Sequence, residues 1–372
     1  MARRIRVGVL FGGQSGEHDV SLRSAQAVMR AIDPERFEVV PIGITRDGKW
    51  LVGGDPLRAL AGQSRLPLAL DQGGDAEVAE RARVAWAGSG TLAVTEHGRT
   101  VSVDVVFPVL HGPNGEDGTV QGLLELAGIP YVGCGVLASA VAMDKPTAKR
   151  LFAEAGLPIA RWFAFTWREW LRNRTEIVSR VERELGYPCF VKPANLGSSV
   201  GVSKVHQPER LAAAVETASR FDRKVVIEEA IDARELEVSV LGNDDPVASI
   251  VGEVVPAREF YDYEAKYLDN RSQLLIPAPI SPEQAETTRA MALAAFKAID
   301  GAGMARVDFF LERQSGRILV NEVNTIPGFT AISMYPKLWE ASGLSFRDLV
   351  TRLIELAVER YEERASRCQS WS

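Results

Sequence analysis

The chain alternates between short apolar runs and segments that carry apolar residues at helical spacing, and this alternation limits its fold more than any other feature. Ile5–Phe11 and Phe37–Ile44 are apolar runs of strand length, and a helical segment capped by Ser21 lies between them. Val103–Leu110 repeats the unit and leads through a glycine-rich turn to a predicted helix over Thr119–Leu126. Strands separated by helices favour a parallel sheet with helices on its faces. The first part of the chain is therefore predicted to be an α/β domain.

A length of 372 residues is too great for one ordinary hydrophobic core and indicates two or three domains. We expect domains over 1–142, 143–224 and 225–372. The segment from about 46 to 100 is glycine-rich and weakly patterned, which favours a surface insertion with short strands. A final helix is predicted over Phe346–Tyr361, with a polar tail that frays after Arg364.

Composition and charge exclude several classes of protein. The net charge of -6 provides no basic surface, so nucleic acid is not an expected partner. The three cysteines are scattered, which argues against disulfides and zinc. No run of 18 apolar residues exists, so no membrane span is expected. Arg6 interrupts the first apolar run and no cleavage-like site follows, so we expect a cytoplasmic protein.

Two pairs of polar residues interrupt apolar segments near the C-terminus. Arg306 and Asp308 belong to one predicted strand, and Glu322 and Asn324 belong to the next. Since alternate residues of a strand point to the same face, a hairpin would gather both pairs on one patch. Oxygen ligands of this kind suit Mg²⁺, which commonly bridges carboxylates and substrate phosphates. Because two such pairs occur and the second leads directly into Thr325–Gly328, the pattern favours a metal site over a solvated sheet face with salt bridges.

The loop Lys192–Gly201 follows a predicted strand and is rich in glycine and serine. Gly197 and Gly201 permit close approach of the backbone, so consecutive N–H groups and two hydroxyls could wrap phosphate oxygens. The loop differs from a Walker A sequence, because its lysine precedes the glycines and no helix is predicted after it. A plain hairpin loop explains this stretch, taken alone, equally well.

Two loops with acidic residues follow predicted strands of the first domain. The loop Gly12–Ser21 leads into a helix, but its glycines do not spell the GxGxxG of dinucleotide-binding folds. Its Glu17 suits a substrate ammonium group, although a capped turn with solvated charges is the commoner role of such a stretch. The loop His111–Gly118 ends another strand of the same sheet. A lone histidine there is usually a structural hydrogen-bonding residue.

A long segment around Phe260–Tyr267 has no periodicity. Long loops of this kind in compact domains are commonly lids over an active site. The segment from about 256 to 275 is therefore predicted to be a lid that brings Lys266 and Tyr267 over a phosphate.

Several stretches resemble the D-alanine–D-alanine ligase family, and they occur in the family's order from roughly residue 5 to residue 340. They read FGGQSGEHDVS, HGPNGEDGTVQGLLELAGIPYVG, MDKPTAKRLFAEAGLP, VKPANLGSSVGVSKV, FYDYEAKY, and GMARVDFF with VNEVNTIPGFT. The resemblance implies a three-domain α/β ATP-grasp fold with an N-terminal parallel-sheet domain like that of biotin carboxylase. ATP would lie between the central and C-terminal domains.

The resemblance also implies which residues contact ATP. The matching positions are Lys145, Lys192, Ser199, Glu228, Glu229, Ile231, Glu235, Phe260, Lys266 and Phe310. Lys145 and Lys192 would hold phosphates, while Phe260 and Phe310 would sandwich the adenine.

Three of these positions carry carboxylates. Glu228 matches the acid that faces the adenine amino group, and Glu235 matches the ribose ligand. The family often has lysine at the position of Glu229, and its contact there is made largely through the backbone. The positions that match ligands of two Mg²⁺ ions, or Mn²⁺, are Asp308, Glu322 and Asn324.

For the two amino-acid substrates, the matching positions are Glu17, His111, Arg306, Gly328, Ser333 and Met334. Glu17 would bind the ammonium group of the first D-alanine, with His111 nearby, and Ser333 and Met334 would receive the carboxylate of the second. The matches to catalytic residues are Glu17, Ser198, Tyr267, Arg306 and Gly328. Among these, Ser198 and Tyr267 belong to a hydrogen-bonded Glu–Ser–Tyr set that closes the lid.

The activity implied is the joining of two D-alanines through an acyl phosphate, for peptidoglycan synthesis, by a cytoplasmic homodimer. The nearest alternatives are ligases of the same fold that make D-alanyl-D-lactate or D-alanyl-D-serine. A nucleotide-binding regulator is a third reading, and the expected metal ligands and Arg306 argue against it. A nicotinamide dehydrogenase is a fourth, and the missing GxGxxG argues against that.

Overall fold

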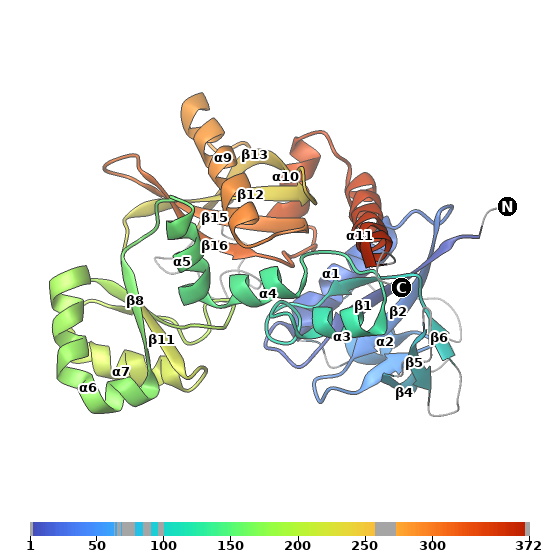
Figure 1. Cartoon of the computed structure of the whole chain (residues 1–372), viewed down its shortest axis with the longest axis horizontal. Coiled ribbons are helices and arrows are strands. Elements are labelled where there is room, and N and C mark those ends of the chain that lie inside the picture. The colour runs from blue at the N-terminus through green and yellow to red at the C-terminus, as the bar shows by residue number, and fades with distance from the viewer. Residues whose placement is uncertain are drawn as a thin grey trace.

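The computed structural model describes residues 3–62, 64, 68, 79–84, 91–95, 100–256 and 273–368. These residues form three β-sheets with helices packed on them, and Figure 1 shows the corresponding three domains. The predicted α/β class is confirmed. No helix in the described part of the chain combines the length and apolarity needed to cross a membrane.

The N-terminal domain contains a mixed seven-stranded sheet in the order β6-β5-β4-β3-β2-β1-β7. Its strands are β1 (Ile5–Gly12), β2 (Phe37–Ile44), β3 (Trp50–Val52), β4 (Glu80–Val84), β5 (Thr91–Thr95), β6 (Thr100–Ser102) and β7 (Val105–Val109). β1 lies parallel to β2 and β7, as the alternation predicts. The weakly patterned segment supplies β3 to β6, which extend the sheet by antiparallel pairing.

The helices of this domain are α1 (His18–Ala31), α2 (Pro56–Ala61), α3 (Thr119–Ala127) and α4 (Val136–Met143). The expectation that Ser21 caps α1 is wrong, because the helix begins three residues earlier and Glu17 occupies the cap position. The hydroxyl of Ser21 instead accepts a hydrogen bond from the N–H of Gly12, at 2.8 Å, and donates to the carbonyl of Val109. Ser21 thus fastens α1 to the ends of β1 and β7.

The central domain contains an antiparallel sheet in the order β10-β9-β11-β8. Its elements are α5 (Lys145–Glu154), β8 (Trp162–Thr166), α6 (Trp167–Arg180) continued by a π-helical turn at Val181–Leu185, β9 (Cys189–Pro193), β10 (Ser203–Val205), α7 (Pro208–Ser219) and β11 (Lys224–Glu229). The glycine- and serine-rich loop joins β9 to β10. The expected domain boundary at 224 falls at the start of β11, so this sheet continues to Glu229.

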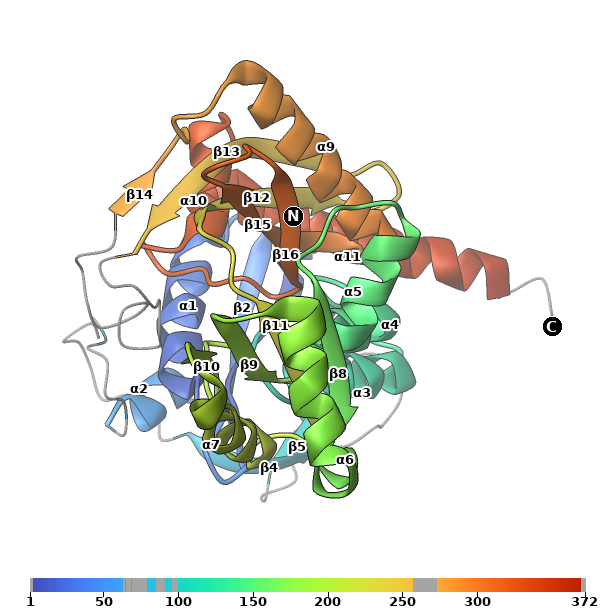
Figure 2. The ribbon, with the colours of Figure 1, turned by 90° about the vertical axis from the view of Figure 1, so that its left-hand side faces the viewer.

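The C-terminal domain contains an antiparallel sheet in the order β14-β13-β12-β15-β16. Its elements are β12 (Ala233–Gly242), β13 (Val247–Val255), β14 (Gln273–Leu275), α9 (Pro282–Ala298), β15 (Gly303–Glu312), β16 (Ile318–Asn324), α10 (Met334–Ala341) and α11 (Phe346–Cys368). Figure 2 shows this sheet above that of the central domain. The predicted fraying after Arg364 is wrong, because α11 continues to Cys368 with Arg367 paired to Glu363 one turn earlier.

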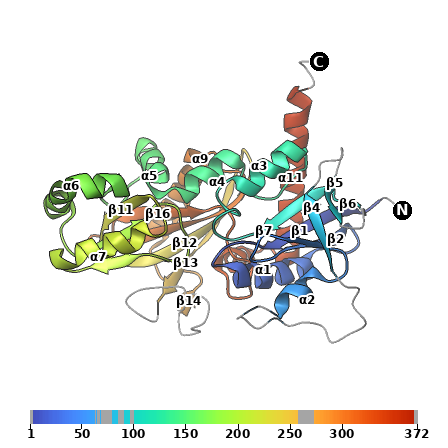
Figure 3. The ribbon, with the colours of Figure 1, turned by 90° about the horizontal axis from the view of Figure 1, so that it is seen from below.

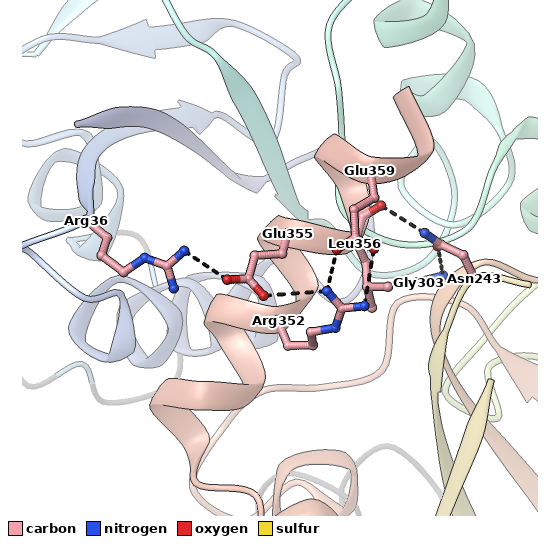
Figure 4. Close-up of polar contacts among 7 residues, drawn as sticks. All are labelled: Arg36, Asn243, Gly303, Arg352, Glu355, Leu356 and Glu359. Atoms are coloured by element: carbon pink, nitrogen blue, oxygen red, sulfur yellow. Dashed lines mark hydrogen bonds and ion pairs between the residues drawn. The ribbon is translucent and has the colours of Figure 1, made fainter. Parts of the chain in front are cut away.

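Helix α11 connects the C-terminal and N-terminal domains. Glu355 accepts a hydrogen bond from Arg36 of the N-terminal domain at 2.8 Å, and the carbonyl of Leu356 accepts one from Asn243 at 3.0 Å (Figure 4). Apolar residues of α11 share one buried cluster with residues of β1 and β7. Figure 3 shows the central and N-terminal domains at opposite ends of the molecule. The shared core and the ion pair hold the N-terminal and C-terminal domains together.

Candidate active site

A cleft of about 540 Å³ is lined by residues of all three domains. Twelve of the positions singled out in the sequence line it: Glu17, His111, Ser198, Glu235, Arg306, Asp308, Phe310, Glu322, Asn324, Gly328, Ser333 and Met334. These residues lie far apart in the chain, so the fold gathers them into one site.

The strands β15 and β16 form one corner of the cleft. Arg306 is paired in register with Asn324, and Asp308 with Glu322, as the predicted hairpin requires. The guanidinium of Arg306 donates to both oxygens of Asp308 at 2.7 Å, and the amide of Asn324 donates to Asp308 at 3.0 Å. Arg306 also lies 3.1 Å from the carboxylate of Glu237 on β12. The corner therefore combines a fixed cation with carboxylates that face the cleft.

The donor set of this corner fits a metal that arrives with a phosphate. Among the described residues, no three His, Cys, Asp or Glu side chains form a group that could hold a metal ion. Asp308 and Glu322 nevertheless place two carboxylates, and Asn324 an amide, along one wall. Mg²⁺ is usually held by one or two carboxylates, with substrate phosphates and water completing its shell. The residues therefore suit a metal shared with a nucleotide.

Lysines of the central domain form a second corner. Lys192 donates to one oxygen of the buried Glu228 at 2.5 Å, and Lys149 pairs with the other oxygen. Lys145 donates to the carbonyl of Leu196 at 2.6 Å. Burial lowers the pKa of Lys145, and the charge of Glu322 offsets only part of that shift. Although burial disfavours its charge, the two ammonium groups lower the pKa of Glu228. Positive charge is thus held next to the β9–β10 loop.

The β9–β10 loop has an unusual backbone. Ser198 and Ser199 have φ angles of 51° and 57°, in the left-handed region that favours glycine. Such conformations persist only where surrounding contacts enforce them. Here the hydroxyl of Ser198 donates to Glu17 of the N-terminal domain. A side chain added at Gly197 would lie 3.2 Å from the same carboxylate. The loop is thus packed directly against the predicted ammonium-binding residue.

The acidic loop after β7 supplies two further groups. Glu116 accepts from the N–H of Gly112 at 2.7 Å and from that of Ile326 at 3.3 Å. Burial, reinforced by the charge of Glu17, raises the pKa of Glu116 to about 8. His111 is buried, and its burial lowers its pKa. One ring nitrogen of His111 faces the carbonyl of Ile326 and the other faces the hydroxyl of Ser24.

The start of α10 also lines the cleft. Ser333 occupies the N-cap position, and its side chain makes no capping hydrogen bond to the helix. It instead binds Thr330, accepting from the backbone N–H at 3.0 Å. A side chain at Gly328 would lie only 2.7 Å from the Ser333 hydroxyl, so a larger residue there would have to displace that hydroxyl. Free N–H groups at a helix start attract anions such as carboxylates.

Family models match two parts of the chain. Residues 6–134 match "D-ala D-ala ligase N-terminus", and residues 151–355 match "D-ala D-ala ligase C-terminus". A D-alanine–D-alanine ligase of Geobacillus thermodenitrificans is 51% identical over 371 residues, covering 97% of each chain. This chain belongs to the D-alanine–D-alanine ligase family. The family predicted from the sequence is confirmed.

Solved structures of ligases agree with this assignment. The D-alanine–D-alanine ligase of Coxiella burnetii superposes with a TM-score of 0.84 at 34% identity, covering 100% of this chain and 98% of the other. A D-Ala:D-Ser ligase of Enterococcus faecalis gives a TM-score of 0.83 at 38% identity, covering 95% and 100%. The ATP-grasp architecture expected from the sequence is therefore confirmed.

The remaining predicted site residues of this ligase-family chain lie outside the lining of the cleft or outside the described residues. Lys145, Lys192, Ser199, Glu228 and Ile231 lie in the adjoining central-domain corner or the segment after β11. The side chain of Glu229 accepts hydrogen bonds from Arg161, whose backbone N–H and Nε both donate to it at 2.7 Å. This leaves its backbone as the available contact. Phe260, Lys266 and Tyr267, with most of the predicted lid, lie outside the described residues.

Sequence reasoning missed three charged residues of this ligase-family site: Lys149, Glu116 and Glu237. Lys149 stands one helical turn after Lys145, and that spacing could have indicated a shared face. Glu237 stands two residues after Glu235 on a strand, the same alternation that identified the metal-site pairs. Glu116 binds the nearby Gly112, but its other partner, Ile326, lies 210 residues away, and no local pattern predicts that contact.

Proposed function

We propose that this enzyme uses ATP to join two D-alanines into D-alanyl-D-alanine, a dipeptide for peptidoglycan precursors. One observation carries the proposal above the others. The pairs Arg306–Asp308 and Glu322–Asn324 line the same cleft as the Glu17–Ser198 contact. The site thus offers a position for a substrate ammonium, a cation for a developing oxyanion, and oxygen ligands for metal and phosphate. This chain is 51% and 50% identical to two named D-alanine–D-alanine ligases, and this similarity adds independent support.

The chemistry follows from the low reactivity of a carboxylate. In this mechanism Glu17 holds the ammonium group of the first D-alanine. The γ-phosphoryl group of ATP is transferred to the carboxylate of that D-alanine, and ADP is the leaving group. The amine of the second D-alanine then attacks the acyl carbon, and phosphate leaves from the tetrahedral intermediate. Arg306 and the backbone N–H of Gly328 stabilise the oxyanion, which is the largest protein contribution expected for acyl transfer. The start of α10, at Ser333 and Met334, receives the second carboxylate.

The nucleotide would lie between the lysine corner and the strand corner. Lys145 and Lys192 offset the charge of its phosphates, and Phe310 and Glu235 contact adenine and ribose in this proposal. Bound at Asp308, Glu322 and Asn324, two Mg²⁺ or Mn²⁺ ions would neutralise phosphate charge during transfer.

Two further parts of the proposal rest on resemblance. Lys266 and Tyr267 would come from a lid that excludes water from the acyl phosphate and closes through a Glu17–Ser198–Tyr267 set. The enzyme would act in the cytoplasm as a homodimer. Neither part is needed for the chemical roles given above.

A D-alanyl-D-serine ligase is the second candidate function, because a D-Ala:D-Ser ligase is among the similar structures at 38% identity. The two functions share the first half-reaction and differ in the amino acid that attacks.

The test is a coupled assay of ADP release with identification of the products. D-Alanine, L-alanine, D-serine and D-lactate are offered singly and in pairs. We expect release with D-alanine alone and D-alanyl-D-alanine as the main product when D-serine or D-lactate is also present. Predominant D-alanyl-D-serine would favour the second candidate. No turnover with any D-amino acid would contradict both.

A further inference from the structure

The loop Thr325–Thr330 contains Gly328, whose N–H the proposed function assigns to the oxyanion. This loop belongs to the C-terminal domain, yet side chains of the N-terminal domain hold it. His111 donates from Nδ1 to the carbonyl of Ile326 at 3.0 Å, and Glu116 accepts from the N–H of Ile326 at 3.3 Å. Both backbone polar groups of Ile326 are therefore fixed by residues more than 200 positions away.

Ser24 on α1 completes the attachment. It is fully buried, accepts from the N–H of Phe329 at 3.2 Å, and lies 3.2 Å from Nε2 of His111. A carbonyl can only accept, so the ring proton of a neutral His111 must be on Nδ1, facing Ile326. Nε2 then accepts from the hydroxyl of Ser24, whose oxygen remains free to accept from Phe329. The chain of hydrogen bonds has one consistent direction.

The side chain of Phe329 fixes the loop from the other side. Its ring is buried and lies 5.7 Å from that of Phe107 on β7, in an edge-to-face arrangement. It also lies 5.5 Å from the ring of Tyr335 on α10. Gly328 thus stands between Ile326 and Phe329, and both of these neighbours are tied to the N-terminal domain.

We propose that Ser24, His111 and Glu116 are positioning residues that set the N–H of Gly328 against the first-substrate site. This inference deepens the proposed function and rests on it. Glu17, the expected ammonium ligand, immediately precedes α1, the helix that carries Ser24. The same unit therefore places the ammonium group of the first substrate and the N–H that meets its reacting carboxyl group. Ser24 is not among the residues that line the cleft, so it acts through the loop.

The test compares Ser24→Ala with the unmodified enzyme. Because the oxyanion is absent from the bound substrates and develops only as the amine attacks, we expect kcat to fall about 10- to 100-fold. KM for ATP and for D-alanine should stay within about twofold. Amide hydrogen exchange of the segment 326–330 should become faster, since the N–H of Phe329 loses its acceptor.

Ser249→Ala is the matched control. Ser249 is also buried, and its hydroxyl also accepts a backbone N–H, that of Ser239 at 3.0 Å, away from the cleft. It should lose comparable stability while keeping its kcat and the exchange of segment 326–330. If Ser24→Ala does not fold, Ser24→Cys keeps the size and a weak acceptor, and a smaller fall in kcat with faster exchange is then expected.

The possible outcomes separate the claims. Unchanged exchange in the Ser24 variant overturns the attachment of the loop. Faster exchange with unchanged kcat overturns the positioning role, and a raised KM with unchanged kcat overturns it in favour of ground-state binding. If the unmodified protein makes no dipeptide, the proposed function fails and takes this inference with it.

Discussion

The corner of the active site that holds Asp308 and Glu322 is built on two hydrogen-bonded strands, whereas the corner that holds Ser198 and Gly328 is built on loops. In the strand corner, the register of β15 and β16 places the side chains, and the ladder itself keeps them there. In the loop corner, Ser198 and its neighbour have positive φ angles, which cost on the order of 1–3 kcal/mol each. Contacts from the N-terminal domain must hold these loops.

This difference predicts two kinds of response to mutation. A change in the strand corner removes chemistry and leaves the fold, because the backbone ladder between β15 and β16 holds these positions whichever side chain they carry. A change in the residues that support the loops alters geometry at a distance, because Ser24 and Phe329 are 305 positions apart and still in contact. The predictions below test this distinction, beginning with the largest effect.

Glu322→Gln should abolish most activity while leaving the fold intact. Glu322 lies opposite Asp308 in the strand pair and lines the cleft. An amide there cannot bridge a metal as a carboxylate does, so turnover should fall by two or more orders of magnitude, or about 3 kcal/mol on the barrier. ADP release at saturating Mg²⁺ and urea unfolding are the two measurements.

Glu312→Gln provides the control for this change. Glu312 ends the strand β15, lies 3.5 Å from Arg317, and is not part of the cleft lining. Its variant should turn over at nearly the rate of the unmodified enzyme. If Glu322→Gln does the same, Glu322 is not a metal ligand.

The strand corner is also the part of the site that local physics could predict. The spacing of Arg306 and Asp308, and of Glu322 and Asn324, was enough to predict that they share one face, because residues two apart on a strand point the same way. Strand β2 was predicted with the bounds that the structure shows. By contrast, family resemblance was needed to give Gly328 a role, since its neighbours in space come from another domain.

The errors and omissions have the same origin. Ser21 has the chemistry of an N-cap, but its hydroxyl is used between β1 and β7, so tertiary contacts override the local preference. Ser24, one turn later, looks like an ordinary helical serine in the sequence. Glu116 and Lys149 likewise gain their roles only from residues that the fold brings near. Contacts over such separations leave no trace in a single sequence.

Lys149→Met should weaken the lysine corner and test whether it depends on buried pairing. Lys149 and Glu228 form an ion pair in which both side chains are almost fully buried. Removing one member leaves a buried carboxylate with only Lys192, and losses of about 3 kcal/mol in unfolding free energy are typical of such changes. KM for ATP should rise about tenfold, because Lys192 is then held more strongly by Glu228. Unfolding curves and ATP titrations of the initial rate measure both effects.

Arg150→Met is the control for that variant. Arg150 is the next residue on the same helix, but it is exposed and its guanidinium lies over the ring of Trp162 at 5.7 Å. The Arg150→Met substitution removes the same charge from the outer face of the helix. It should change KM for ATP by less than about twofold. Equal effects of the two substitutions would show that general charge, and not the buried pair, matters.

The smallest effect concerns pH and the support of the loop corner by Glu116. Burial and the charge of Glu17 raise the pKa of Glu116 from 4.5 to about 8, and the hydrogen bonds from Gly112 and Ile326 and the charge of Arg306 offset only part of that rise. The folded protein therefore holds this proton more tightly than the unfolded chain. The stability that this tighter proton binding gives the folded state is complete below about pH 4.5 and is lost as the pH rises towards 8.

Glu116→Gln carries a neutral group of the same shape, and any change in its hydrogen bonds is independent of pH. Relative to this variant, the unmodified enzyme should lose at least about 1 kcal/mol of unfolding free energy between pH 5 and pH 8. Urea unfolding of both proteins at several pH values measures the difference, and parallel pH profiles would mean that Glu116 is ionised throughout and supports the loop as a carboxylate.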